Sequence, residues 1–123
     1  MNILVVDDEQ DMQTLFEQRF RKEIRDKKVN FAFASSGEDA LNYMKDHKHE
    51  AVLILSDINM PGMSGLELLK CIKQQFKTPP PIVMMVTAYG DQDNYNNAMK
   101  LGADDFLTKP IDFTQLKEKL KIQ

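Results

Sequence analysis

Short apolar runs alternate with helical patterns along the whole chain, and this alternation restricts the fold more than any other feature. Apolar residues at helical spacing fill the segments between the runs. Strict alternation of strand and helix predicts parallel strands joined by right-handed helical crossovers. The sequence therefore predicts an α/β fold with a doubly wound parallel sheet. The five strand-like runs are Ile3–Val6, Val29–Ala34, Val52–Leu55, Ile82–Val86 and Phe106–Leu107.

Local signals agree with this pattern of elements. The first, third and fourth runs are nearly uninterrupted and rich in β-branched residues, as central strands covered on both faces should be. The second run alternates and starts with polar residues, which places it nearer an edge. Ser64 precedes Glu67 by three residues, a capping box at a helix start, and Asp112 with Gln115 offers a weaker one. Gly102 is suited to end a helix.

Composition limits the classes of protein that the chain can represent. A length of 123 residues suits one domain, so we expect residues 1–123 to form a single unit. The net charge of −3 gives no basic footprint for nucleic acid or an anionic membrane. The one cysteine, Cys71, fits a reducing compartment. No apolar run approaches the roughly 20 residues needed to cross a bilayer. These features predict a cytoplasmic protein without nucleic-acid or membrane partners.

Chemically capable side chains follow the predicted strands at the point where each strand ends. Asp7 and Asp8 follow the first strand, and Asp57 follows the third. Thr87 and Lys109 stand at the ends of the fourth and fifth. Because the carboxyl ends of parallel strands meet at one edge of a sheet, we expect these side chains to form one shallow site.

Three aspartates at one edge repel each other, and their pKa values rise unless a cation lies among them. Mg²⁺ prefers oxygen ligands and is held by one or two carboxylates together with phosphate oxygens. Two aspartates and a main-chain carbonyl just beyond Asp57 would suit it. The alternative is that Asp7 and Asp8 only cap the first helix.

Lys109 and Thr87 extend this prediction to phosphoryl transfer. The lysine could pair with Asp57 or with a phosphoryl oxygen, and the threonine hydroxyl could donate to another oxygen. Each residue alone is also an ordinary surface or strand-end residue. Together they provide a carboxylate nucleophile and the charge neutralisation that this chemistry mostly requires.

Four segments carry a resemblance to a known family. The chain resembles the receiver domains of response regulators in two-component signalling. This resemblance implies a flavodoxin-like (βα)5 fold with strand order 2-1-3-4-5, two helices on one face and three on the other. The matching segments are Ile3–Glu9, Ser56–Gly65, Val86–Ala88 and Gly102–Pro110.

The resemblance also implies roles at the strand ends. Asp57 matches the phosphoacceptor, and Lys109 matches the lysine that contacts the phosphoryl group. Asp8 matches a direct ligand of Mg²⁺ or Mn²⁺, Asn59 the residue that offers its backbone carbonyl to the metal, and Asp7 an acid acting through metal-bound water. Asp57 would be a further metal ligand.

A conformational switch is implied as well. Thr87 and Phe106 match a coupled pair that reshapes the surface of the fourth helix, fifth strand and fifth helix. Phe106 lacks a hydroxyl, so its switching must rely on burial of the ring. The segment Asp93–Asn97 is poor in strong helix formers and is a candidate moving part. Tyr89, two residues beyond Thr87, is predicted to modulate the lifetime of the phosphoryl group.

The implied partners are a histidine kinase or phosphotransfer protein as donor and an output domain or partner protein as receiver of the signal. A phosphorylation-dependent dimer is compatible with the resemblance. The domain would be a signalling phosphoacceptor that assists its own phosphorylation and dephosphorylation. The sequence leaves open whether it stands alone or begins a longer protein.

Three alternatives remain at this point. A phosphohydrolase of the haloacid-dehalogenase type needs a second acid two residues after the nucleophile, where this chain has Asn59. A nucleotide-binding module of similar topology needs a glycine- or hydroxyl-rich phosphate loop where Asp7-Asp8-Glu9 stands. A receiver fold that docks partners without being phosphorylated is disfavoured by the complete set of five key residues in this chain.

Overall fold

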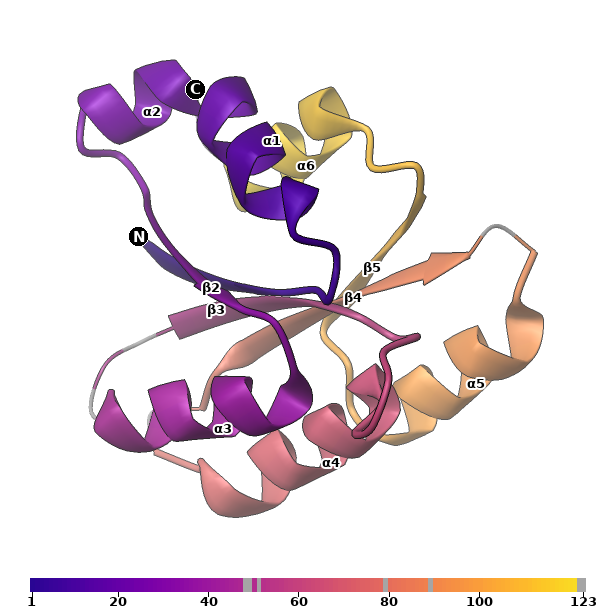
Figure 1. Cartoon of the computed structure of the whole chain (residues 1–123). Coiled ribbons are helices and arrows are strands. Elements are labelled where there is room, and N and C mark those ends of the chain that lie inside the picture. The colour runs from indigo at the N-terminus through magenta and orange to yellow at the C-terminus, as the bar shows by residue number, and fades with distance from the viewer. Residues whose placement is uncertain (48–49, 51, 79, 89, 122–123) are drawn as a thin grey trace.

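Five parallel strands form one sheet at the centre of the molecule (Figure 1). The computed structural model describes residues 1–47, 50, 52–78, 80–88 and 90–121. The strand order is β2-β1-β3-β4-β5, which confirms the expected topology, and the alternating β2 is an edge strand as predicted. The strands are β1 (Asn2–Val6), β2 (Asn30–Ala34), β3 (Val52–Asp57), β4 (Ile82–Ala88) and β5 (Asp105–Lys109).

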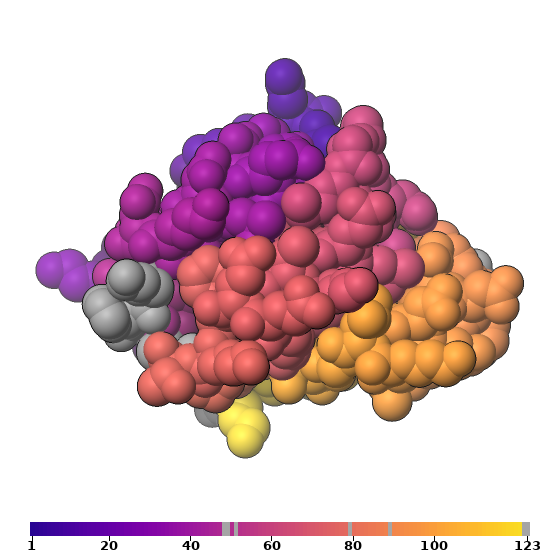
Figure 2. Space-filling view, turned by 90° about the horizontal axis from the view of Figure 1, so that it is seen from below, coloured from indigo at the N-terminus to yellow at the C-terminus, as the bar shows by residue number. Residues whose placement is uncertain are grey.

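Helices cover both faces of the sheet (Figure 1). One face carries α1 (Asp11–Arg19), α2 (Arg21–Arg25) and α6 (Phe113–Leu120). The other carries α3 (Gly37–Asp46), α4 (Gly65–Gln75) and α5 (Gln92–Lys100), which together form the surface seen in Figure 2. Within the described residues, no helix has the length and apolar character needed to span a membrane.

The first helical segment differs from the sequence-based expectation. Its apolar positions from Met12 to Ile24 predict one helix, but the chain forms two, which meet at Phe20 with φ −111° and ψ 20°. Helical backbone bonds from Phe20 to Phe16 and from Ile24 to Phe20 persist across the bend, both 2.9 Å long. Phe20 is fully buried and stacks on Phe16 with 5.9 Å between ring centroids. The bend therefore lies at a residue anchored in the core.

Each face of the sheet has its own apolar core. Successive residues of a strand point to opposite faces. Leu4 and Val6 accordingly belong to the core under α3, α4 and α5, whereas Ile3 and Val5 belong to the core under α1, α2 and α6. Burial on both faces explains why the central strands are uninterrupted apolar runs.

The predicted helix boundaries are confirmed. The Ser64 hydroxyl accepts a hydrogen bond from the backbone N–H of Glu67 at 3.2 Å, which caps α4. The Asp112 carboxylate accepts one from the backbone N–H of Gln115 at 3.1 Å and caps α6. Gly102 follows α5 with a φ of 92°, a left-handed conformation that glycine adopts without strain.

Candidate functional site

The five predicted polar side chains lie at the carboxyl edge of the sheet. Asp57 ends β3, Lys109 ends β5, and both Asp57 and Thr87 are only 4% exposed. Asp7 and Asp8 follow β1 directly. Parallel pairing of β1, β3, β4 and β5 thus brings segments from four parts of the chain to one edge.

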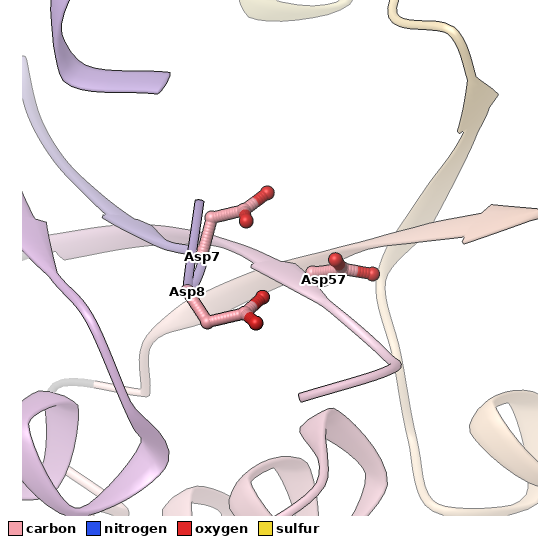
Figure 3. A group of neighbouring side chains, drawn as sticks. All are labelled: Asp7, Asp8 and Asp57. Atoms are coloured by element: carbon pink, nitrogen blue, oxygen red, sulfur yellow. The ribbon is translucent and has the colours of Figure 1, made fainter. Parts of the chain in front are cut away.

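Three carboxylates gather there. One carboxylate oxygen from each of Asp7, Asp8 and Asp57 lies within 4.8 Å of the others, and the three groups project in the same direction from the ends of β1 and β3 (Figure 3). Burial raises the pKa of Asp7; the backbone N–H of Glu9 opposes that rise, and the charge of Asp57 adds to it. This mutual repulsion is the kind that a divalent cation relieves, and three oxygen donors suit Mg²⁺.

Asp7 and Asp8 do not cap the first helix, so that alternative is wrong. Gln10 is the residue at the N-cap of α1, and its side chain makes no capping hydrogen bond. The carboxylate of Asp7 instead accepts a hydrogen bond from the backbone N–H of Glu9 at 2.9 Å. The turn after β1 is therefore closed by a site residue before the helix begins.

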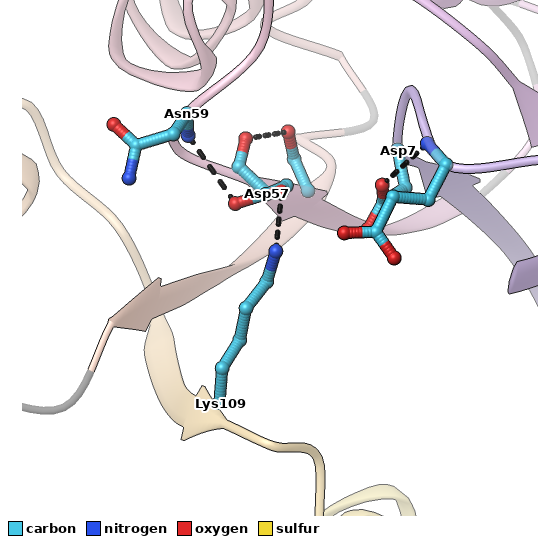
Figure 4. A network of polar contacts seen from close by, with 6 residues as sticks. Asp7, Asp57, Asn59 and Lys109 are labelled. Carbon is cyan, nitrogen blue, oxygen red and sulfur yellow. Dashed lines mark hydrogen bonds and ion pairs between the residues drawn. The ribbon is translucent and has the colours of Figure 1, made fainter.

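Lys109 reaches across from β5 to Asp57 (Figure 4). Its Nζ lies 2.6 Å from Asp57 Oδ2, and the peptide bond from Lys109 to Pro110 is cis. Partial burial lowers the pKa of Lys109, but the hydrogen bond and charge of Asp57, with the charges of Asp7 and Glu9, outweigh that effect and raise it overall. The lysine is therefore a cation at neutral pH, paired with the carboxylate of Asp57.

The loop after β3 is fixed on two sides. The backbone N–H of Asn59 donates to Asp57 Oδ1 at 3.2 Å (Figure 4). The N–H of Ile58 donates to the carbonyl of Val86 in β4 at 3.2 Å, and the N–H of Gly65 donates to the carbonyl of Ile58 at 2.8 Å. Both carboxylate oxygens of Asp57 thus have a partner, and the backbone around them is held by β4 and α4.

Gly65 is a site residue that sequence reasoning did not single out. A Cβ at this position would lie 2.1 Å from the carbonyl oxygen of Asp57 and 2.7 Å from the Cα of Ile58. Only glycine lets α4 begin so close to the end of β3. The available signal was a glycine directly after the Ser64 cap, where a better helix former is expected.

The two predicted switch residues lie on neighbouring strands and differ in burial. Thr87 is buried in β4, where it pairs with Thr108 of β5. Phe106 is partly buried in β5, and its ring centroid lies 4.5 Å from that of Tyr95 in α5, a contact that the sequence did not indicate. Tyr89 lies outside the described residues.

Comparisons with known proteins agree with this geometry. The family model of the response regulator receiver domain matches residues 3–121. Response regulator RppA of Synechocystis is 33% identical over 121 residues, which are 98% of this chain and 49% of RppA. The DNA-binding transcriptional regulator NtrC of Proteus hauseri is 39% identical over 114 residues, 93% of this chain and 22% of NtrC. The chain thus spans half or less of the length of these relatives.

Solved structures lead to the same family. A receiver domain protein from Clostridium thermocellum superposes with a TM-score of 0.83 at 29% identity, covering 98% of this chain and 90% of that one. The co-crystal structure of the Saccharomyces cerevisiae histidine phosphotransfer signaling protein Ypd1 with the receiver domain of its downstream response regulator Ssk1 gives a TM-score of 0.84 at 28% identity, with coverages of 98% and 86%. The chain belongs to the response regulator receiver domain family of two-component signalling.

Proposed function

We propose that the chain accepts a phosphoryl group on Asp57 and changes its surface in response. One observation carries the proposal: the buried Asp57 carboxylate has the Lys109 ammonium at 2.6 Å and two further carboxylates within 4.8 Å. A nucleophile, a fixed cation and a cluster of oxygen donors in one place are the components that phosphoryl transfer to a carboxylate needs.

The residues divide the work as follows. Mg²⁺ or Mn²⁺ held by Asp8, Asp57, the Asn59 carbonyl and, through water, Asp7 would neutralise charge on the incoming phosphoryl group. An Asp57 carboxylate oxygen attacks the phosphorus atom. The bond from phosphorus to the donor nitrogen or oxygen breaks, and the donor atom keeps the electron pair. Lys109 then pairs with a phosphoryl oxygen.

Thr87 and Phe106 would convert this event into a change of shape. The Thr87 hydroxyl donates to a phosphoryl oxygen, and Phe106 turns into the space that Thr87 leaves. This alters the surface of α5, β5 and α6, which an output domain or partner reads. These are the expected fourth helix, fifth strand and fifth helix, because the first helical segment forms both α1 and α2. Moving a two-state equilibrium from 1:99 to 99:1 requires about 5.5 kcal/mol of differential stabilisation, which a covalent phosphoryl group with its ion pairs must supply.

The phosphodonor would be a histidine kinase or a phosphotransfer protein. A groove of about 550 Å³ adjoins the site, with Asp7 and Lys109 on its border and mostly apolar walls from α1 and the segment after β5. A folded partner that presents a donor histidine could pack on these apolar walls beside Asp7 and Lys109. The pairing of Ypd1 with the receiver domain of Ssk1 supports a partner of this kind.

We place the protein in the cytoplasm, with residues 1–123 as one receiver domain.

Intact mass after incubation with Mg²⁺ and acetyl phosphate tests the proposal. The wild-type protein should gain one phosphoryl mass, and it should not do so when Mg²⁺ is chelated. Asp57→Asn should gain none, whereas Asp26→Asn, which changes an exposed aspartate between α2 and the amino end of β2, should behave like the wild type. If the wild-type protein stays unmodified, the proposal is refuted in favour of a receiver fold that docks partners without being phosphorylated. If Asp57→Asn gains the same mass, the phosphoacceptor is another residue.

A further inference from the structure

Two aromatic rings meet where the helix α5 packs on the sheet edge. The centroids of Tyr95 and Phe106 are 4.5 Å apart and the ring planes are inclined by 44°. Phe106 packs against the apolar core beneath α3, α4 and α5, whereas Tyr95 is 37% exposed on the surface of α5. Tyr95 therefore covers one side of the residue that the proposed switch must move.

The backbone of Phe106 has little freedom. It pairs with Met85 in the neighbouring strand, and its N–H donates to Asp105 Oδ1 at 2.8 Å. The same oxygen accepts a hydrogen bond from Lys119 of α6 at 2.9 Å. A change at Phe106 must consequently be a rotation of its side chain, and the ring contact with Tyr95 opposes that rotation.

Tyr95 is held in place from the start of its helix. Its N–H donates to the carbonyl of Asp91 at 3.2 Å. Asp91 caps the helix through Oδ1, which accepts from the N–H of Asn94 at 3.2 Å, while its Oδ2 accepts from the Asn94 side-chain amide at 2.7 Å. The cap fixes the turn from which the Tyr95 ring extends toward Phe106.

We propose that Tyr95 is a positioning residue that holds Phe106 in its present place and so sets how readily the domain switches. This inference rests on the proposed function, because the switched state is the one that the phosphoryl group stabilises. If only a fraction of molecules occupies that state, the apparent affinity for a phosphoryl mimic is reduced by this fraction. Loss of the ring contact raises the fraction. The free energy that an aromatic pair contributes corresponds to a change of about 2- to 10-fold in the equilibrium constant between the two states.

Titration with beryllium fluoride in the presence of Mg²⁺ measures this affinity without covalent chemistry. Tyr95→Ala and Tyr95→Leu should bind the mimic about 2- to 10-fold more tightly than the wild type, because neither keeps the aromatic contact. Tyr95→Phe keeps the ring and should bind like the wild type. Met99→Ala, which removes an exposed side chain one turn further along α5, should also leave the Kd unchanged. Unchanged or weaker binding by Tyr95→Ala overturns the proposal.

The ring itself can be observed directly. The chain has three tyrosines, so protein labelled with 3-fluorotyrosine should give three ¹⁹F resonances, and Tyr95→Phe identifies one of them. That resonance should move when intact mass shows phosphorylation, and an unmoved resonance in fully phosphorylated protein contradicts the role of Tyr95. Wild-type protein that neither binds the mimic nor gains a phosphoryl group would instead refute the proposed function, and the inference with it.

Discussion

Replacing Asp7 by Asn should stabilise the protein when no divalent cation is present. Two unit charges 4.8 Å apart repel each other by about 3.5 kcal/mol at an effective dielectric constant of about 20, and by under about 1 kcal/mol in bulk water. The nearby cation of Lys109 cancels part of this repulsion. An asparagine retains the acceptor for the Glu9 N–H. We therefore expect a net gain of about 1 kcal/mol in the free energy of unfolding.

The gain should depend on pH in a defined direction. Burial, with the charge of Asp57, raises the pKa of Asp7 in the folded state above its usual value of 3.8. The carboxylate therefore costs nothing well below pH 3.8, where it is protonated in both states. Its cost grows as the pH rises above 3.8 and is complete once the pH exceeds the folded pKa. The advantage of Asp7→Asn should grow as the pH rises above 3.8 and should vanish well below it.

Mg²⁺ should remove the stability advantage of Asp7→Asn. Binding at 100 times the Kd stabilises a protein by about 2.7 kcal/mol, and binding that is tenfold weaker gives about 1.4 kcal/mol at the same concentration. If Asp7 contributes a tenfold factor through metal-bound water, wild type and variant become about equally stable in Mg²⁺.

Thermal and urea unfolding with EDTA and with Mg²⁺ measure both effects. Without metal, the melting temperature of Asp7→Asn should exceed that of the wild type by about 3–5 °C. Asp26→Asn removes an exposed carboxylate whose ion pair is with the exposed Arg25, so it should change little in either buffer. The reasoning is refuted if Asp7→Asn is the less stable protein in EDTA, or if Mg²⁺ stabilises both proteins equally.

Two further predictions concern packing and acid stability. Gly65→Ala should cost about 2–3 kcal/mol in urea unfolding, because its Cβ meets the backbone of Asp57. Gly37→Ala, also at the first position of a helix, should cost less, because the three atoms nearest to its Cβ belong to the flexible side chain of Met63; equal costs would contradict this reasoning. Burial raises the pKa of Glu23, but its hydrogen bond and ion pair with Lys117, 3.0 Å away, outweigh this and lower it below the usual 4.5. The pair should therefore stabilise the fold above pH 4.5 and lose this effect as the pH falls through the folded pKa. A stability difference between wild type and Glu23→Gln that does not shrink as the pH is lowered below 4.5 would disagree.

The sheet and the contents of the site were predictable because both depend on local pattern plus one geometric rule. Apolar runs marked the strands, and parallel strands place their ends together, so Asp57 and Lys109 had to approach each other. The contact between Tyr95 and Phe106 follows from how α5 packs, which no local pattern encodes. The bend at Phe20 was equally hidden, because the helical hydrogen bonds and the apolar spacing continue through it. The capping box placed Gly65 at the start of a helix, but the close approach of this position to the Asp57 carbonyl depends on how α4 meets the end of β3, which no local pattern encodes.

The contact between Lys109 and Asp57 has a consequence for every cation that enters the site. The ammonium group is tethered to β5, so its effective concentration beside the carboxylate does not fall on dilution of the protein. An incoming metal ion therefore meets a permanent competitor, which lowers its apparent affinity. The same ion pair keeps the carboxylate of Asp57 partly neutralised before any other group binds. On the proposed function, Lys109 would therefore affect both the selectivity of the resting site against weakly binding cations and the reactivity of the Asp57 carboxylate.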